Sequence, residues 1–180
     1  MGRKNLNNRK INPIYWIFCE GETEESFISY LRSKYRLSVK IISKIAGNSI
    51  NSRFIANCKK GKVTHKKDMD FLLYDTDNIV ILDKLKKIKA KILFSNPCIE
   101  LWFLLHYKDQ ISFISSEDCL QELKKRNKTY NKGAIDNNLK EVFDNKIKDA
   151  CNRAKKLTLY KNPSSNIFEF IEMLEVVKNN

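Results

Sequence analysis

The sequence contains few of the residues that break regular structure, with five glycines and three prolines among its 180 residues. That scarcity excludes a collagen-like chain and argues against a disordered, low-complexity protein. Long hydrophobic runs are also missing, because the longest apolar segment, Cys98 to Tyr107, contains Glu100 and is too short to span a bilayer. The first residues lack the apolar core of a signal peptide, and position 6 is Leu rather than the Ser or Thr of a myristoylation motif. We therefore predict no membrane partner and a soluble, cytoplasmic protein.

The cysteine and histidine content excludes several classes of site. The five cysteines are an odd number with no C-x-x-C pair, which argues against a disulfide framework or a zinc site and fits a reducing cytoplasm. Only two histidines, His65 and His106, are available for histidine-driven catalysis. No P-loop, G-x-S-x-G or H-E-x-x-H motif occurs. Cys19 is better interpreted as a strand residue than as a nucleophile, because neighbouring carboxylates disfavour a thiolate.

Acidic residues are absent between Glu25 and Asp68, and the whole chain carries a net charge of +13. This charge favours a polyanionic partner, with nucleic acid as the commonest candidate, an anionic membrane surface as its rival and a solubility surface as the plain alternative. A second, more diluted basic region runs from Lys124 to Lys161. Phosphate backbones would bind such surfaces with a strong salt dependence. The lysines that we predict to bind nucleic acid are Lys59, Lys60, Lys62, Lys66 and Lys67.

Strand-like apolar runs alternate with helical patterns in the first part of the chain, which predicts parallel βαβ units. The expected strands are Ile14–Cys19, Leu37–Ile45, Phe71–Tyr74 and Lys91–Phe94. The expected helices among them are Thr23–Tyr35, a helix from Asn48 or Ser49 to Lys60, Asn78–Ile88 and Cys98–Tyr107. Beyond them we expect a short strand at Gln110–Ile114, helices at Ser116–Arg126 and Asp136–Leu157, and a last helix to Val177 capped by Asn162-Pro163-Ser164-Ser165.

The length and this pattern predict one compact domain. Residues 1–12 are polar and basic and are expected to form a flexible arm. Residues 13–108 would form an α/β core with a sheet of four or five strands. Residues 109–180 would form a mainly helical part packed on that core.

Two acidic clusters directly follow strand-like runs, Glu20 with its neighbours after the first and Asp75-Thr76-Asp77 after the third. In an open α/β sheet, ligand groups gather at the carboxyl ends of the strands. Glu20 precedes Gly21, which permits a tight turn and the close approach of a ligand. We predict that Glu20, Asp75 and Asp77 converge on a divalent metal, Mg²⁺ or Mn²⁺, with Glu20 as ligand or general base. The plain alternatives are helix-start acids, among them Glu24, and a capping role for Asp77.

A third cluster, Ser95-Asn96-Pro97-Cys98-Ile99-Glu100-Leu101-Trp102, continues to His106 in the most apolar stretch of the chain. Asn96 lies at a strand exit, and Glu100 follows by one helical turn, so both are candidates for the same crevice. A Glu in an apolar helix is costly without a partner, and that partner is either the metal site or a Lys or Arg in a buried salt bridge. We consider Glu100 a candidate catalytic residue, and Glu24, Asn96 and His106 candidates for supporting the site. For His106, a structural hydrogen-bonding role is the favoured interpretation.

These segments resemble the Toprim fold and, more closely, the RloB family, which includes restriction-locus and phage-defence proteins. The pattern is carried by Glu20-Gly21-Glu22-Thr23-Glu24, Tyr74-Asp75-Thr76-Asp77, the segment from Ser95 through His106, and Asn162-Pro163-Ser164-Ser165. The first two segments are shared by many Toprim proteins, whereas Ser-Asn-Pro-Cys-x-Glu-Leu-Trp is specific to the family. The resemblance implies an α/β fold with a Toprim-like, Rossmannoid parallel sheet flanked by helices and a helical C-terminal extension.

The resemblance also implies Mg²⁺-dependent phosphodiester chemistry. Carried onto this chain, the general acid/base or metal ligand is Glu20, and the metal-binding pair is Asp75 and Asp77. Toprim relatives in defence systems include nucleases that attack tRNA or phage DNA, so the expected activity is a nuclease acting on RNA or DNA in anti-phage defence. No ATPase domain and no DNA-breaking tyrosine domain is visible, so topoisomerase activity is not expected and an ATPase sensor would be a separate protein.

Two hypotheses from other classes remain open beside the nuclease. One is a catalytically silent subunit that binds nucleic acid or a partner protein, and the other is a nucleotide-processing phosphotransferase. A nuclease requires Glu20, Asp75 and Asp77 intact. A binding subunit would tolerate Glu20→Gln and Asp77→Asn but would lose function when the Lys59–Lys67 cluster is neutralised.

Overall fold

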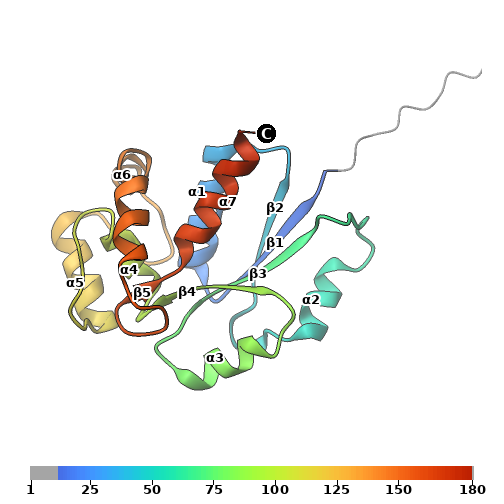
Figure 1. Ribbon diagram of the computed structural model, residues 1–180, viewed down its shortest axis with the longest axis horizontal. Coiled ribbons are helices and arrows are strands. Elements are labelled where there is room, and N and C mark those ends of the chain that lie inside the picture. Colours follow the sequence, from blue (N-terminus) through green and yellow to red (C-terminus); the bar gives the residue numbers. More distant parts are fainter. Residues whose placement is uncertain (1–11, 180) are drawn as a thin grey trace, which may run out of the picture.

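The computed structural model describes residues 12–179 and shows an α/β fold built on a five-stranded sheet (Figure 1). The strands are β1 (Ile14–Cys19), β2 (Lys40–Ile45), β3 (Met69–Asp75), β4 (Lys91–Asn96) and β5 (Ser164–Ser165). They lie in the order β2-β1-β3-β4-β5, and all neighbours are parallel except β4 and β5. The predicted Rossmannoid, mostly parallel sheet is confirmed. The predicted basic arm falls outside the described residues, except for Asn12.

Helices connect and flank these strands, as the alternating pattern predicts. The α-helices are α1 (Glu22–Tyr35), α2 (Ser52–Lys59), α3 (Ile79–Lys86), α4 (Ile99–Leu104), α5 (Ser116–Arg126), α6 (Asn137–Lys155) and α7 (Ile167–Lys178). A short 3-10 turn, η1 (Gly47–Ser49), precedes α2. Because η1 occupies the expected helix start, α2 begins later, with the Asn51 side chain accepting the Phe54 N–H. Within residues 12–179 no helix has both the length and the apolar character needed to cross a membrane.

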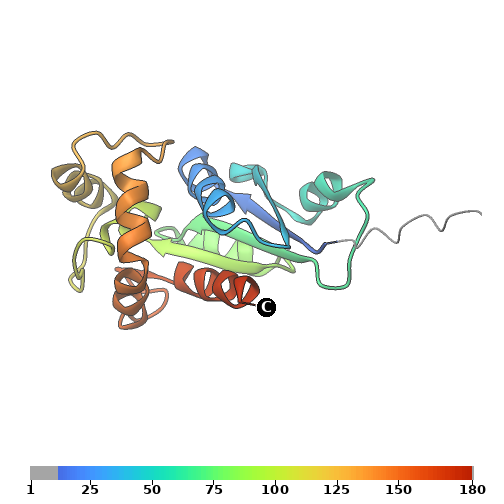
Figure 2. The ribbon, with the colours of Figure 1, turned by 90° about the horizontal axis from the view of Figure 1, so that it is seen from above.

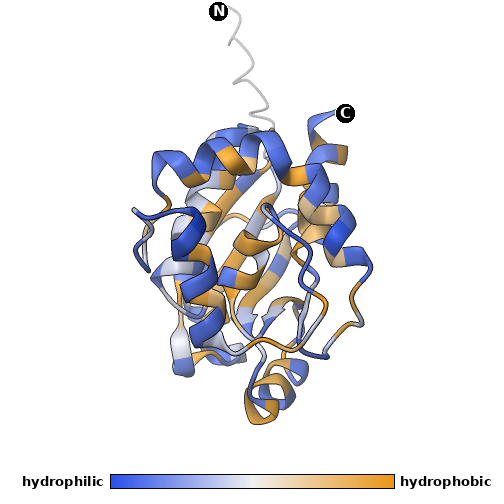
Figure 3. Cartoon of the chain, turned by 90° about the vertical axis from the view of Figure 1, so that its left-hand side faces the viewer, coloured by the Kyte–Doolittle hydropathy of each residue, from blue (hydrophilic) through white to orange (hydrophobic). Residues whose placement is uncertain are grey.

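Successive side chains of each strand point to opposite faces of the sheet, and each face has its own core. Ile17, Phe71 and Leu73 belong to the larger core, which they share with α1 and α4 to α7. Trp16 and Leu72 belong to a smaller core beneath α2 and α3. Figure 2 looks onto α1 and α7, which lie side by side over one face. Figure 3 shows hydrophobic residues on the strands and hydrophilic residues on the outer sides of most helices. The C-terminal helices thus share a core with the sheet.

The helices α4, α5 and α6 lie beyond the carboxyl ends of the strands, on the left in Figure 1. All six residues of α4 are buried. Side chains of α5 and α6, including Cys119, Leu123 and Phe143, belong to the same core as α4. This helical part therefore covers the carboxyl ends of the strands, where the predicted site residues lie.

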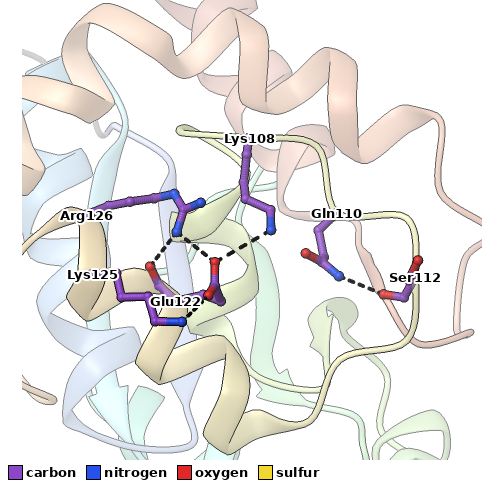
Figure 4. A network of polar contacts seen from close by, with 6 residues as sticks. All are labelled: Lys108, Gln110, Ser112, Glu122, Lys125 and Arg126. Carbon is purple, nitrogen blue, oxygen red and sulfur yellow. Dashed lines mark hydrogen bonds and ion pairs between the residues drawn. The ribbon is translucent and has the colours of Figure 1, made fainter.

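The predicted strand at Gln110–Ile114 is wrong, because this segment is a loop. The strand that pairs with the outer side of β4 is β5 instead. Side chains satisfy the loop backbone instead: Asn162 bonds both the N–H and the C=O of Ile114, and Gln110 donates to the Ser112 carbonyl (Figure 4). Figure 4 also shows ion pairs between Glu122 of α5 and Lys108, Lys125 and Arg126. Lys125 and Arg126 belong to α5 itself, so it is the Lys108 contact that links α5 to the segment after α4.

The predicted capping role of Ser164 and Ser165 is largely wrong as well, because the two residues form β5. The Ser165 hydroxyl accepts the Ile167 N–H at 3.4 Å, but the cap position of α7 is Asn166. The Asn166 side chain does not cap the helix, since it bonds the Phe94 N–H and the Ile92 carbonyl of β4. This segment therefore closes the sheet edge rather than simply starting a helix.

Candidate active site at the carboxyl edge of the sheet

The carboxyl ends of β1, β3 and β4 lie next to one another in the sheet. Cys19 pairs with Leu73 in register, and Asp75 pairs with Ser95. Glu20 follows β1 directly, and its Oε2 accepts the backbone N–H of Asp75 at 2.9 Å. The Glu20 carboxylate is thus joined to the backbone of Asp75 by a hydrogen bond between the ends of two neighbouring strands.

Asp75 points toward the larger core, because it is separated from Leu73 and Phe71 by even steps along β3. Its Oδ1 is buried and has no hydrogen-bond partner among the described residues. Burial raises the pKa of Asp75 well above its usual value, and the carboxylates of Glu24, Glu20 and Glu100 raise it further. The side chain is therefore held in an environment that disfavours its negative charge.

Glu24 has a structural partner, as its interpretation as a helix-start acid predicts. Its Oε2 accepts the Gly21 N–H at 2.8 Å, at the start of α1. The side chain is nonetheless buried, and burial followed by the charges of Glu20 and Glu100 raises its pKa, against the effect of the backbone hydrogen bonds. Glu24 thus caps α1 and also contributes to one group of mutually repelling carboxylates.

Glu100 stands in the first turn of α4 and is only 1% exposed. Its Oε1 accepts the Tyr130 hydroxyl at 2.9 Å and lies 3.7 Å from the Lys132 ammonium. Its Oε2 is buried without a partner among the described residues. The structure thus shows a lysine beside Glu100, as one of the two sequence interpretations predicts, but it leaves half of the carboxylate unsatisfied.

Tyr130 and Lys132 are site residues that the sequence interpretation missed. They belong to the polar loop between α5 and α6, and the sequence signals for them are only the basic character of that region and an aromatic residue within a polar loop. The loop reaches α1, because the Gly133 N–H donates to Thr23 Oγ1 at 3.0 Å and the Ser26 hydroxyl donates to the Gly133 carbonyl at 2.6 Å. Contacts between segments so far apart in sequence could not be inferred from spacing.

Glu20 is intermediate in exposure, and Asp77 is exposed. Burial raises the pKa of Glu20, the hydrogen bond from the Asp75 N–H lowers it, Asp77 raises it and Lys132 lowers it. Asp77 does not cap α3, because that position belongs to Asn78, whose side chain accepts the Val80 N–H. Within residues 12–179 no three Asp, Glu, His or Cys side chains stand close enough to hold one metal ion together.

Two candidate supporting residues have partners of their own. Asn96 donates from its side chain to the Tyr160 carbonyl at 3.3 Å. His106 is 2% exposed, its Nδ1 lies 2.9 Å from the Trp102 carbonyl, and its ring packs against Trp102 and Phe143. Burial lowers the pKa of His106 to about 3. These contacts are those of a neutral core histidine.

The predicted nucleic-acid-binding lysines are not beside the carboxylates. Lys59 ends α2 and bonds Asp70 at 2.8 Å, and the remaining four follow in the segment that leads to the amino end of β3. Asp75 stands at the other end of the same strand. Because β3 has seven residues and a strand rises about 3.3 Å per residue, roughly 20 Å of strand lies between Asp75 and the end of β3 at which the lysine segment arrives.

A comparison with protein-family models finds one that matches residues 15–174, and its description is RloB-like protein. This match covers the whole sheet except Ile14 and nearly all of the described helices. No curated protein and no solved structure matches the chain.

Proposed function

The chain belongs to the family of RloB-like proteins, and on that premise we propose that it is a metal-dependent nuclease that hydrolyses phosphodiester bonds of RNA, with tRNA among the candidates, or of DNA. One observation carries the proposal. The Glu20 carboxylate accepts the backbone N–H of Asp75 at the ends of adjacent strands, and buried oxygens of Asp75 and Glu100 lack partners among the described residues. Unpartnered buried carboxylate oxygens are costly, and a bound cation would relieve that cost.

The chemistry of these donors suits Mg²⁺ or Mn²⁺, both of which prefer oxygen ligands. Mg²⁺ is usually held by one or two carboxylates, with water and substrate phosphate completing its shell. This mode does not require three protein ligands close together, and it agrees with the spacing of the described side chains. In our proposal one or two of Glu20, Asp75 and Asp77 hold the ion directly, and the bound ion would supply positive charge to a phosphodiester.

The environment of Glu20 suits a residue that exchanges a proton with water. Because burial and Asp77 raise its pKa, the carboxylate is a stronger base than an exposed glutamate. In the proposed reaction, a water oxygen forms a bond to phosphorus while Glu20 takes up its proton. One phosphorus–oxygen ester bond breaks, and the leaving oxygen is protonated by solvent. The products are a phosphate monoester and a hydroxyl.

The resemblance to defence proteins extends the proposal to the setting. We propose that the nuclease acts in the cytoplasm against phage infection, with a separate ATPase as sensor if one is required. All five cysteines are unpaired, as is typical of proteins from a reducing compartment.

The second candidate function is a catalytically silent subunit that binds nucleic acid or a partner protein. It is favoured by the roughly 20 Å that separates the predicted lysine cluster from the carboxylates along β3. A protein that only binds has no need to bring these two groups together.

The test uses purified full-length protein with bulk tRNA and plasmid DNA in Mg²⁺, followed by sequencing of the ends produced. We expect Glu20→Gln and Asp75→Asn each to abolish cleavage without unfolding the protein. Asp83→Asn is the matched control, because Asp83 is exposed and makes only a 3.9 Å contact with Lys86. Cleavage retained by the Glu20→Gln protein would overturn the nuclease proposal. Nucleic-acid binding without cleavage by the wild type would favour the silent subunit.

A further inference from the structure

The loop that carries Lys132 is fixed on both sides of this residue. On one side Tyr130 is 2% exposed and donates its hydroxyl to Glu100. On the other side Gly133 is bonded through both its N–H and its C=O to side chains of α1. The backbone of Lys132 is therefore held between α4 and the start of α1, the helix that follows Glu20.

The Lys132 side chain lies between the solvent and a buried carboxylate. It is 61% exposed, yet its ammonium lies 3.7 Å from a carboxylate that is 1% exposed. The charges of Glu100, Asp75 and Glu24 raise its pKa against the opposing effect of burial, so the group stays protonated. A cation in this position faces both the solvent and the carboxylate group.

A purely structural ion pair is the plain alternative, and the geometry does not favour it. The distance of 3.7 Å is longer than the about 2.8 Å of a well-formed charged hydrogen bond. The same oxygen of Glu100 is already bonded by Tyr130, and the other oxygen remains without a partner among the described residues. A lysine with a structural task would contact the unsatisfied oxygen, whereas the side chain of Lys132 is mostly exposed to solvent.

We propose that Lys132 contacts the reacting phosphate and stabilises the negative charge that develops there during cleavage. The inference rests on the proposed nuclease function, because it assigns the phosphate-binding cation of the same site. It also supplies positive charge next to the carboxylates, where the Lys59–Lys67 cluster is absent. A phosphate oxygen that reached the exposed side of the ammonium would lie beside the carboxylates and any ion they hold.

The test compares Lys132→Met, which removes the charge but keeps most of the side chain, with Lys132→Arg. Lys128→Met is the matched control, because Lys128 is exposed in the same loop, next to Asn127 and Thr129, which bond Asp136. Cleavage of bulk tRNA and plasmid DNA, half-saturation by Mg²⁺ and Tm are measured for each protein. Removal of a group that stabilises developing charge typically costs about 100-fold or more in kcat.

We expect Lys132→Met to lose about 100-fold in kcat, with KM and Mg²⁺ half-saturation close to wild type and only a small fall in Tm from the lost contact with Glu100. Lys132→Arg should recover part of the loss because it keeps the charge, and Lys128→Met should match wild type. Cleavage by Lys132→Met at the wild-type rate would overturn the inference while the nuclease proposal stands. A large fall in Tm together with poor recovery in Lys132→Arg would also overturn it, in favour of a structural ion pair. A wild type that cleaves neither substrate would overturn the nuclease function and this inference together.

Discussion

At the scale of single residues, the candidate site holds several carboxylates close together, although their mutual repulsion opposes folding. Glu20, Glu24, Asp75 and Glu100 come from three segments, and the charges of the other three raise the pKa of Asp75. Only part of this repulsion is offset within the protein, by Lys132 and by backbone N–H donors. Ionisable groups whose surroundings disfavour their charged form are frequent at functional sites. The site therefore costs stability in the absence of a cation.

This cost predicts that Asp75→Asn is more stable than wild type in EDTA at pH 7. Each unit by which burial raises the Asp75 pKa corresponds to about 1.4 kcal/mol of unfolding free energy lost at neutral pH, and each kcal/mol shifts Tm by about 2–4 °C. Because the pKa is higher in the folded state, the cost is absent below the unfolded value of about 4 and grows as pH rises through the folded value. The gain in Tm should therefore be largest at pH 7 and vanish near pH 4.

Differential scanning calorimetry from pH 4 to pH 8 in EDTA measures this gain. Asp83→Asn, at an exposed carboxylate, should change Tm little at any of these pH values. An Asp75→Asn protein that melts below wild type at pH 7 would show that the Asp75 charge is satisfied in a way that the structure does not contain.

At the scale of elements, the sequence predicted best where local patterns decide the structure. The apolar runs that form β1, β3 and β4 and the acids that follow them were recognisable, because alternation and strand-end placement are local properties. The expected strand at Gln110–Ile114 failed because its backbone partners are supplied by Asn162, 48 residues away. Tyr130 and Lys132 were missed for the same reason, since only tertiary contacts bring their loop to Glu100.

We predict that substitution of Gly133, in the loop between α5 and α6, lowers both stability and cleavage. This residue has φ +84°, and an added Cβ would lie 3.1 Å from Glu22 Oε2. Gly133→Ala should lose about 1–2 kcal/mol of stability from the left-handed backbone. The exposed Glu22 side chain can move away from the added Cβ, but relief of the backbone strain would move the loop that holds Lys132, so cleavage should also fall.

Gly61→Ala is the matched control, because Gly61 has φ +73° but no atom within 4 Å of an added Cβ. Chemical denaturation and cleavage assays on both proteins separate the two effects. Similar losses of stability with a loss of cleavage only in Gly133→Ala are expected. Equal cleavage by the two variants would show that the loop position does not matter for the reaction.

At the scale of the whole molecule, the predicted nucleic-acid-binding lysines and the carboxylates of the candidate site are associated with opposite ends of β3. The +13 net charge favours nucleic acid, but four of the predicted lysines stand in the segment before β3, whereas the carboxylates follow β1 and β3. The residue numbers do not reveal this separation, because Lys67 shortly precedes Asp75 in the sequence while the full length of β3 lies between them. A strand of nucleic acid would need to run along the molecule to contact both groups.

This arrangement predicts that the lysine cluster supports affinity rather than the chemical step. Changing Lys60, Lys62, Lys66 and Lys67 together to Gln should weaken binding of bulk tRNA and plasmid DNA. The slope of log K against log salt should fall by about 0.7–0.9 for each phosphate that the variant no longer neutralises. At saturating substrate, kcat should stay near wild type, because these side chains lie roughly 20 Å from Asp75 along β3. Lys59 is left unchanged in this variant because its bond to Asp70 is structural.

Binding titrations at several salt concentrations, with cleavage measured in parallel, separate the two effects. A large fall in kcat with an unchanged salt slope would mean that the cluster acts at the reaction centre, and it would contradict this prediction.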